Sequence, residues 1–150
     1  MNNIQPFNQL KTGTIKDYLI FLDIDGTLIE DSEIEVDKEG IKKINELKKH
    51  NQIYLCPNGP DRKRNRAVAE LCKLDYLDTD IKKPSKKILN LIDIQSPDKK
   101  LVIGDKFLTD GLFAKRIKAD FIKVKRITSK NDKLYIKFLY WIDDLIYKII

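Results

Sequence analysis

The segment Phe21–Leu28, which reads FLDIDGTL, places two carboxylates one residue apart at the end of an apolar run. The residues Tyr18–Leu22 predict a buried strand, because a short apolar run ended by turn residues is typical of strands covered on both faces. Asp23 closes this strand, Asp25 follows on the same side, and Gly26 permits a sharp turn. Carboxylates this close repel each other unless a cation or a shared proton offsets the repulsion, so the segment predicts a ligand site at the strand end.

Apolar strands and amphipathic helices alternate along the rest of the chain. Further strands are expected at 53–56, 75–77, 101–103 and 121–124. Helices are expected after the N-cap residue Asp37, from Pro60 with a buried stripe of Ala67, Val68 and Leu71, from Pro84, and over 110–118 and 133–150. This alternation predicts right-handed crossovers and a mostly parallel sheet covered on both faces, which is a three-layer, Rossmann-like α/β fold.

Composition agrees with one globular domain. The chain has 150 residues, of which 42% are hydrophobic and 35% charged, so we expect a lead-in over 1–17 and a single domain over 18–150. The net charge of +6 favours anionic partners (phosphorylated metabolites, nucleic acid or an acidic membrane surface), although a lysine-rich solvated surface explains it equally well. Cys56 and Cys72 lack metal-ligand spacing, and neither a signal peptide nor a membrane span is visible, so we expect a cytoplasmic protein.

The carboxyl ends of parallel strands meet at one edge of a sheet, where such folds bind ligands. The segments expected there are 23–25, 57–59, 82–83 and 105. A carboxylate such as Asp23 can act as a nucleophile in phosphoryl transfer, and a second carboxylate, Asp25, can protonate the leaving oxygen and later activate water. Thr27 offers a hydroxyl and a backbone N–H to an anion.

Two further motifs add charge to this edge. In VIGDKFLTD, Asp105 can complete an oxygen cage for Mg²⁺, and Asp110 can hold a metal-bound water or the lysine, or simply cap the following helix. In IKKP, Lys83 precedes a proline and is therefore held extended, so that it can neutralise phosphoryl oxygens. Taken alone, the lysines of 82–87 are more typical of a solvated basic face.

These three motifs, in this order, resemble those of the haloacid dehalogenase (HAD) superfamily of Mg²⁺-dependent phosphatases. The resemblance implies Asp23 as nucleophile and Asp25 as general acid/base. It also implies a metal site formed by Asp23, Asp25 (through its carbonyl), Asp105 and Asp110, with Lys83 steadying it. The second aspartate points to a phosphatase, because the dehalogenases of the superfamily lack it.

Within the superfamily, the run at 104–127, GDKFLTDGLFAKRIKADFIKVKRI, resembles the class III branch that contains phosphatidylglycerophosphate phosphatases. One position departs from the family pattern. Pro57 stands at the second strand tip, where the family has Ser or Thr to hold the phosphoryl group. Asn58 and the Gly59 N–H are the candidate replacement donors, and a plain turn explains the PNGP segment equally well.

The intervals between the motifs leave no room for a cap domain, so we expect an open cleft that suits a bulky substrate, such as a phospholipid headgroup phosphate. Oligomerisation is another way to cover such a cleft. Four basic residues follow the second strand tip and are expected near the cleft, where they would attract phosphate: Arg62, Lys63, Arg64 and Arg66.

The C-terminal segment LYIKFLYWIDDLIYKII has an apolar stripe at helical spacing, formed by Leu134, Phe138, Trp141, Leu145 and Ile149. Core packing is the usual explanation of such a stripe, and an interfacial helix on a membrane is the alternative.

The leading functional hypothesis is a Mg²⁺-dependent phosphatase that works through an aspartyl-phosphate. Two alternatives stay open: an inactive phosphate- or protein-binding module, which Pro57 favours, and a nucleic-acid end phosphatase, which the net charge favours.

Overall fold

The computed structural model describes residues 3–93 and 97–150, so the first two residues of the predicted lead-in lie outside it. Five strands form one sheet in the order β3-β2-β1-β4-β5, and every pairing is parallel. The strands are β1 (Tyr18–Leu22), β2 (Gln52–Leu55), β3 (Asp75–Tyr76), β4 (Lys99–Gly104) and β5 (Asp120–Lys123). The predicted α/β fold with a parallel sheet is confirmed.

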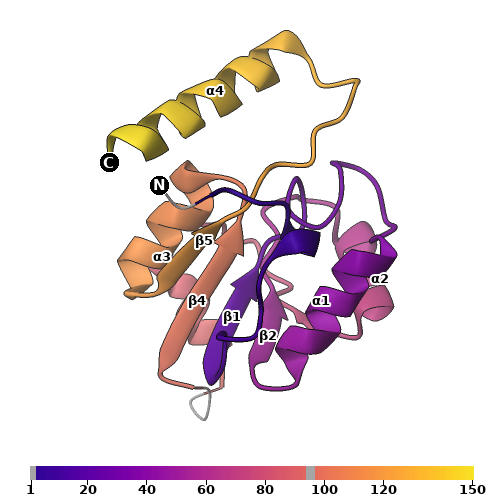
Figure 1. The fold of residues 1–150 in the computed structure, drawn as a ribbon, viewed down its shortest axis with the longest axis vertical. Coiled ribbons are helices and arrows are strands. Elements are labelled where there is room, and N and C mark those ends of the chain that lie inside the picture. The colour runs from indigo at the N-terminus through magenta and orange to yellow at the C-terminus, as the bar shows by residue number, and fades with distance from the viewer. Residues whose placement is uncertain (1–2, 94–96) are drawn as a thin grey trace.

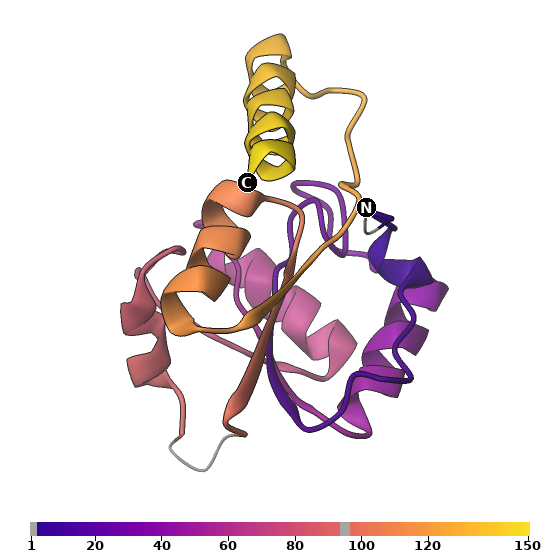
Figure 2. The same cartoon turned by 60° about the vertical axis from the view of Figure 1, so that its left-hand side comes forward.

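Helical segments cover both faces of this sheet (Figures 1 and 2). They are η1 (Phe7–Gln9), α1 (Lys38–Lys48), α2 (Arg62–Cys72), η2 (Lys86–Leu91), η3 (Phe107–Gly111) and α3 (Leu112–Ile117). A further helix, α4 (Leu134–Ile149), follows β5. Because side chains alternate along a strand, Ile20 and Leu22 face α1 and α2, whereas Leu19 and Phe21 face η2 and α3. The result is a Rossmann-like arrangement of three layers.

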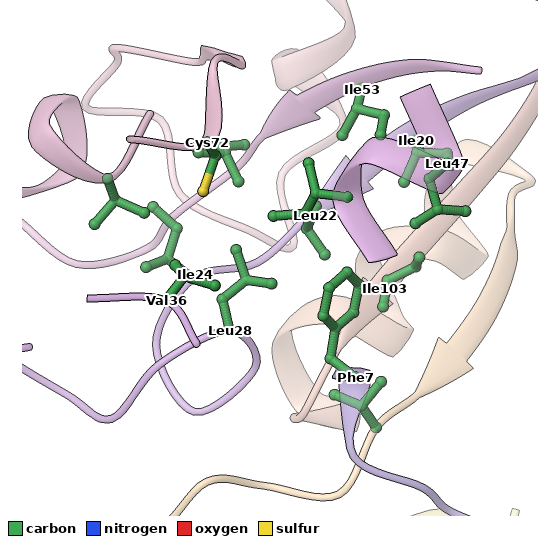
Figure 3. Packing of buried hydrophobic residues seen from close by; sticks show 14 of the residues in the cluster. Phe7, Ile20, Leu22, Ile24, Leu28, Val36, Leu47, Ile53, Cys72 and Ile103 are labelled. Carbon is green, nitrogen blue, oxygen red and sulfur yellow. The ribbon is translucent and has the colours of Figure 1, made fainter. Parts of the chain in front are cut away.

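The larger core cluster extends beyond the sheet and its helices (Figure 3). Phe7, Leu10 and Ile15 of the segment before β1 are buried in the same cluster as Ile20 and Ile103. Figure 3 shows the Phe7 ring within this group of aliphatic side chains. The segment before β1 therefore adds apolar area to the core of the domain.

Two helices begin later than predicted. α2 starts at Arg62 rather than Pro60, because the Asp61 carboxylate accepts a hydrogen bond from the Arg64 N–H and caps the helix there. Leu71 is 48% exposed, which contradicts its predicted burial, since the buried face of α2 includes Val68 and Cys72 instead. Pro84 does not open a helix, and η2 begins only after Ser85, its N-cap.

The helix predicted over 110–118 is divided into the π-helical turn η3 and the α-helix α3. Asp110 lies inside the turn, and its carboxylate binds the Lys83 ammonium and the Lys106 N–H. Gly111, not Asp110, precedes α3, and no side chain caps that helix. The capping alternative for Asp110 is therefore wrong, because a buried ammonium is a stronger partner for a carboxylate than a neutral N–H.

α4 differs most from expectation. It stands apart from the layers, at the end of the molecule toward which the labelled strands point (Figures 1 and 2). The core packing predicted for its apolar stripe is wrong, since the five residues of the stripe are between 41% and 84% exposed. Asp143 is the buried residue of α4. Within 3–93 and 97–150, no helix combines the length and the apolar character that crossing a membrane needs.

Candidate functional site

The site lies where the order of the strands reverses. From β1 the chain builds β2 and β3 on one side and then returns to place β4 on the other side of β1. Leu22 pairs with Ile103 at the ends of these two strands, and the Asp23 N–H continues the ladder to the Ile103 carbonyl, 3.0 Å away. Asp23 and Asp105 therefore leave neighbouring strand tips side by side, at the position where ligands bind in open parallel sheets.

Three buried carboxylates converge at these tips. One oxygen from each of Asp23, Asp105 and Asp110 lies within 4.8 Å of the others. Asp23 is 7% exposed, and the other two are more deeply buried. Three anionic groups this close in a poorly solvated place require compensation by cations or protons.

Lys83 supplies one compensating charge. Its ammonium lies 2.7 Å from Asp23 Oδ1 and 2.5 Å from Asp110 Oδ1, and its side chain is almost fully buried. Burial alone would lower the pKa of Lys83, but the carboxylates of Asp110 and Asp23 outweigh burial and raise it. Lys83 is therefore a permanent cation, and it holds one oxygen of Asp23 in an ion pair.

The Arg126 guanidinium, 3.4 Å from Asp105 Oδ2, supplies a second charge, but two cations do not neutralise three buried carboxylates. Burial, with the charges of Asp23 and Asp110, raises the pKa of Asp105 to about 8. Burial likewise raises the pKa of Asp110 to about 6, although Lys83 opposes the rise. Without a metal ion, Asp105 therefore keeps its proton at neutral pH, and Asp110 gains one as the pH falls below about 6. Hard oxygen donors with this excess of negative charge suit Mg²⁺, so the residues present fit that ion.

We expect the metal-free protein to lose stability as the pH rises. Both carboxyls bind protons more tightly in the folded chain than in the unfolded chain, where the pKa of Asp is about 3.9. The free energy of unfolding should therefore fall by up to about 1.4 kcal/mol per pH unit for each group, between about pH 4 and pH 6 for Asp110 and between about pH 4 and pH 8 for Asp105.

Thermal unfolding in EDTA across this pH range measures the effect. Added Mg²⁺ should flatten the pH dependence, because the cation replaces the protons. A melting temperature that is constant or rises with pH in EDTA would contradict the raised pKa values.

Two glycines allow the carboxylates to approach the backbone. Gly26 has φ of +74°, and a Cβ there would lie 2.5 Å from Asp105 Oδ2. A Cβ on Gly104 would overlap the side chain of Asp110. The Gly in each of the two acidic motifs thus leaves space for an aspartate of the site.

The predicted substrate donors have partners inside the protein. Thr27 is fully buried, and its hydroxyl lies 3.3 Å from Asp23 Oδ2 and 3.4 Å from Asp105 Oδ1. The Asn58 amide accepts from the Lys83 N–H at 2.9 Å and donates to the Lys83 carbonyl at 3.1 Å. Thr27 therefore orients carboxylates, and Asn58 positions Lys83.

Asp25 faces a cleft of about 500 Å³ beside the cluster. The cleft is lined by Asp23, Asp25, Asp31, Ser32, Asn58, Gly59, Pro60, Asp61, Arg64, Lys106 and Thr109. Gly59 comes so near that a Cβ on it would lie 2.9 Å from Asp25 Oδ2. Burial raises the pKa of Asp25, while the Arg64 guanidinium partly opposes the rise. Asp25 is therefore set apart from the carboxylate cluster and retains a proton more readily than an ordinary aspartate.

Arg64 has a role that the sequence did not reveal. It was expected with Arg62 and Arg66 as a phosphate-attracting group, but it is buried and forms an ion pair with Asp25 at 2.7 Å. Its Nε donates to the Glu33 carbonyl at 2.6 Å. Arg62 and Arg66 pair with Asp78 on the surface. The basic cluster is thus largely neutralised by acidic partners.

A second buried charge network supports the loop that carries Asp105. Asp143 of α4 accepts hydrogen bonds from the N–H groups of Phe107 and Leu108, at 2.8 and 2.7 Å. Lys123 of β5 lies 3.0 Å from Asp143 and donates to the Asp105 carbonyl. The sequence does not reveal the role of either residue, because nothing in their spacing shows that Asp143 and Lys123 meet. The structure shows that α4 holds the loop that carries Asp105 through Asp143.

Replacing Asp143 with Ala should destabilise the protein by about 3 kcal/mol, because it leaves the buried Lys123 and two N–H groups without this partner. This loss of stability lies at the low end of the range for a broken buried ion pair, because Lys123 keeps a second carboxylate, Asp144, 3.1 Å away. Urea unfolding measures it. Asp144→Ala is the matched control and should cost less than 1 kcal/mol, as the Asp144 side chain is 59% exposed. Equal losses for both variants would contradict the proposed support of the loop.

Comparisons with protein-family models, with curated proteins and with solved structures found no match to this chain. Its chemistry is therefore read from its own residues. The site combines a crowded carboxylate, Asp23, a neighbouring carboxyl of raised pKa, Asp25, and a buried ammonium, Lys83. Such a set can bind a divalent cation, deliver a nucleophilic oxygen and transfer a proton.

Proposed function

We propose that the protein is a Mg²⁺-dependent phosphomonoesterase of the HAD type that works through an aspartyl-phosphate. The observation that carries this proposal is the convergence of Asp23, Asp105 and Asp110 around one point, with Lys83 bound to two of them. The pattern of the three motifs, which resembles that of HAD phosphatases, supports the same function.

Asp23 is the proposed nucleophile. Lys83 and Thr27 hold its two oxygens at 2.7 and 3.3 Å, so the carboxylate is oriented before substrate arrives. One carboxylate oxygen attacks phosphorus, and the bond from phosphorus to the ester oxygen breaks. Mg²⁺, held by Asp23, Asp105 and the Asp25 carbonyl with Asp110 behind them, would offset the charge of the phosphoryl oxygens.

Asp25 is the proposed general acid and base. Its raised pKa favours the protonated carboxyl that the leaving oxygen needs, and its position on the cleft faces the substrate side. After the alcohol leaves, the Asp25 carboxylate takes a proton from water as the water oxygen attacks phosphorus. Inorganic phosphate and the free Asp23 carboxylate result.

The cleft supports a bulky substrate. Its lining comes from several loops at the edge of the sheet, among them Pro60 and Asp61 between β2 and α2, and Lys106 and Thr109 of the η3 region. We propose a capless site that admits a phosphomonoester carried on a larger group, such as a phospholipid headgroup phosphate. A small metabolite would leave much of the cleft to water.

Turnover of an aryl phosphate tests the proposal. We expect release of inorganic phosphate in Mg²⁺, loss of turnover in EDTA and recovery when Mg²⁺ is restored. The same protein should then be offered phospholipid, phosphosugar and end-phosphorylated oligonucleotide substrates, which separates the substrate classes. If the wild-type protein hydrolyses none of these substrates in Mg²⁺, the proposed phosphatase activity is wrong.

One observation favours a second candidate, a phosphate-binding module without turnover. Pro57 has neither a hydroxyl nor an N–H to offer at the second strand tip, and loss of one such donor costs on the order of 10²–10³ in turnover. Binding of Mg²⁺ and phosphate by calorimetry, with no hydrolysis of any ester, would support this candidate.

A further inference from the structure

α4 presents an apolar face to solvent. Of the thirteen large hydrophobic side chains that are exposed among the described residues, eight belong to the segment 134–150. Phe138 and Trp141 stack on each other there, with ring centroids 5.9 Å apart. Exposed apolar area concentrated on one helix marks a surface that another phase or molecule covers.

The orientation of α4 is held by polar contacts on its other side. Asp143 binds the η3 backbone, the Lys123 ammonium lies over the Tyr147 ring, and the Lys106 ammonium over the Tyr140 ring. At 100° per residue, Tyr140, Asp143 and Tyr147 lie opposite the stripe of Leu134, Phe138, Trp141, Leu145 and Ile149. The helix cannot bury its apolar face on its own domain without breaking this network.

The charges around the stripe are cationic. Lys137 and Lys148 are exposed and, eleven residues apart, follow the same border of the stripe. Lys130 and Lys133 are exposed at the start of the helix. The acidic groups of this segment are engaged within the chain: Asp132 accepts from Ser129, Asp143 from Phe107 and Leu108, and Asp144 pairs with Lys123.

We propose that α4 is an interfacial helix that binds an anionic lipid bilayer, with Phe138, Trp141 and Leu145 in the acyl boundary and the lysines at the headgroups. An apolar face with aromatic residues and a lysine border is what such a surface recognises. A second copy of the chain is the poorer occupant, because a symmetric contact would bring the same lysines together, while the carboxylates of this segment already have partners within the chain.

α4 lies close to the cleft, so the position of a bound bilayer relative to the cleft follows from it. The helix packs on η3, and Thr109 of η3 and the preceding Lys106 line the cleft. α4 also lies at the end of the molecule toward which the strands point (Figure 1). A bilayer bound by α4 therefore lies beside the cleft. The inference does not depend on the proposed function, since lipid binding requires no turnover.

Trp141 is the only tryptophan in the chain, so its fluorescence reports on the stripe directly. We expect its emission to shift to the blue when vesicles of equal parts phosphatidylcholine and phosphatidylserine are added to the full-length protein. Co-sedimentation should show binding to the same vesicles and much weaker binding to pure phosphatidylcholine. The double variant Phe138→Asp with Leu145→Asp should bind about 100-fold less, because two apolar side chains no longer leave water.

Leu71→Asp is the matched control, since Leu71 is an exposed leucine on α2, and it should bind vesicles like the wild type. Thermal unfolding shows that each variant is folded. Two results with vesicles would overturn the proposal: binding without a blue shift of the Trp141 emission, or unchanged binding by the double variant. A third would be a blue shift without vesicles that increases with protein concentration, accompanied by a dimer in sedimentation. The last would assign the stripe to a second copy.

Discussion

Asp23→Asn is expected to lower the turnover of an aryl phosphate by on the order of 10⁴-fold or more, because it removes the proposed nucleophile. The amide keeps the size of the side chain and can still contact Thr27, so the geometry of the site should change little. It cannot attack phosphorus as a carboxylate does. Steady-state phosphate release in saturating Mg²⁺ measures the loss.

Asp31→Asn is the matched control for this variant. Asp31 lines the same cleft but lies outside the carboxylate cluster, and its side chain is 42% exposed. It should retain turnover within about tenfold, because its contact with the cluster is indirect, through Arg126, which lies 3.6 Å from Asp31 and 3.4 Å from Asp105. If Asp23→Asn keeps wild-type turnover, or if both variants lose equally, Asp23 is not the nucleophile.

Lys83→Met is expected to destabilise the metal-free protein by about 3–5 kcal/mol at neutral pH, because two buried carboxylates then face each other without an ammonium. Methionine preserves the length and much of the volume of the side chain, so loss of packing should be small. The loss should shrink as the pH falls toward 5, since the carboxyls of Asp105 and Asp110, whose pKa values are already raised, become protonated.

Lys82→Met makes the same chemical change one residue earlier, on an exposed side chain, and should leave the free energy of unfolding within about 0.5 kcal/mol of the wild type. Urea unfolding at several pH values compares the two variants. A Lys83→Met protein as stable as Lys82→Met at neutral pH would show that the carboxylates do not need this ammonium. Turnover should also fall sharply for Lys83→Met, since Asp23 loses the group that orients it.

Much of the candidate site could be predicted, because several of its residues belong to short motifs that directly follow predicted strands. Asp23, Lys83 and Asp105 were placed at one edge by the rule that parallel strands end together, and the structure brings them together with Asp110. The roles of Thr27 and Asn58 could not be predicted in the same way. Their hydrogen-bond partners depend on side-chain directions that no pattern of residue types specifies.

The partners of Arg64 and Asp143 could not be predicted from the sequence. Arg64 stands in a run of basic residues that is typical of a solvated surface, yet it is buried against Asp25, which lies 39 positions earlier in the chain. Asp143 reaches the backbone of Phe107 across 36 positions. Such pairs form only after the layers have packed, because each buried charge takes whichever opposite charge the fold brings near.

By itself, the sequence determined the strands, the alternation that makes their sheet parallel, and the presence of crowded carboxylates at a strand tip, because these follow from local periodicity and turn chemistry. Only the tertiary structure decided which way the apolar stripe of α4 points. Periodicity defines a stripe on a helix but not the side that faces the protein, and here the bonds of Asp143 and the contacts of Lys106 and Lys123 with Tyr140 and Tyr147 turn the polar side inward.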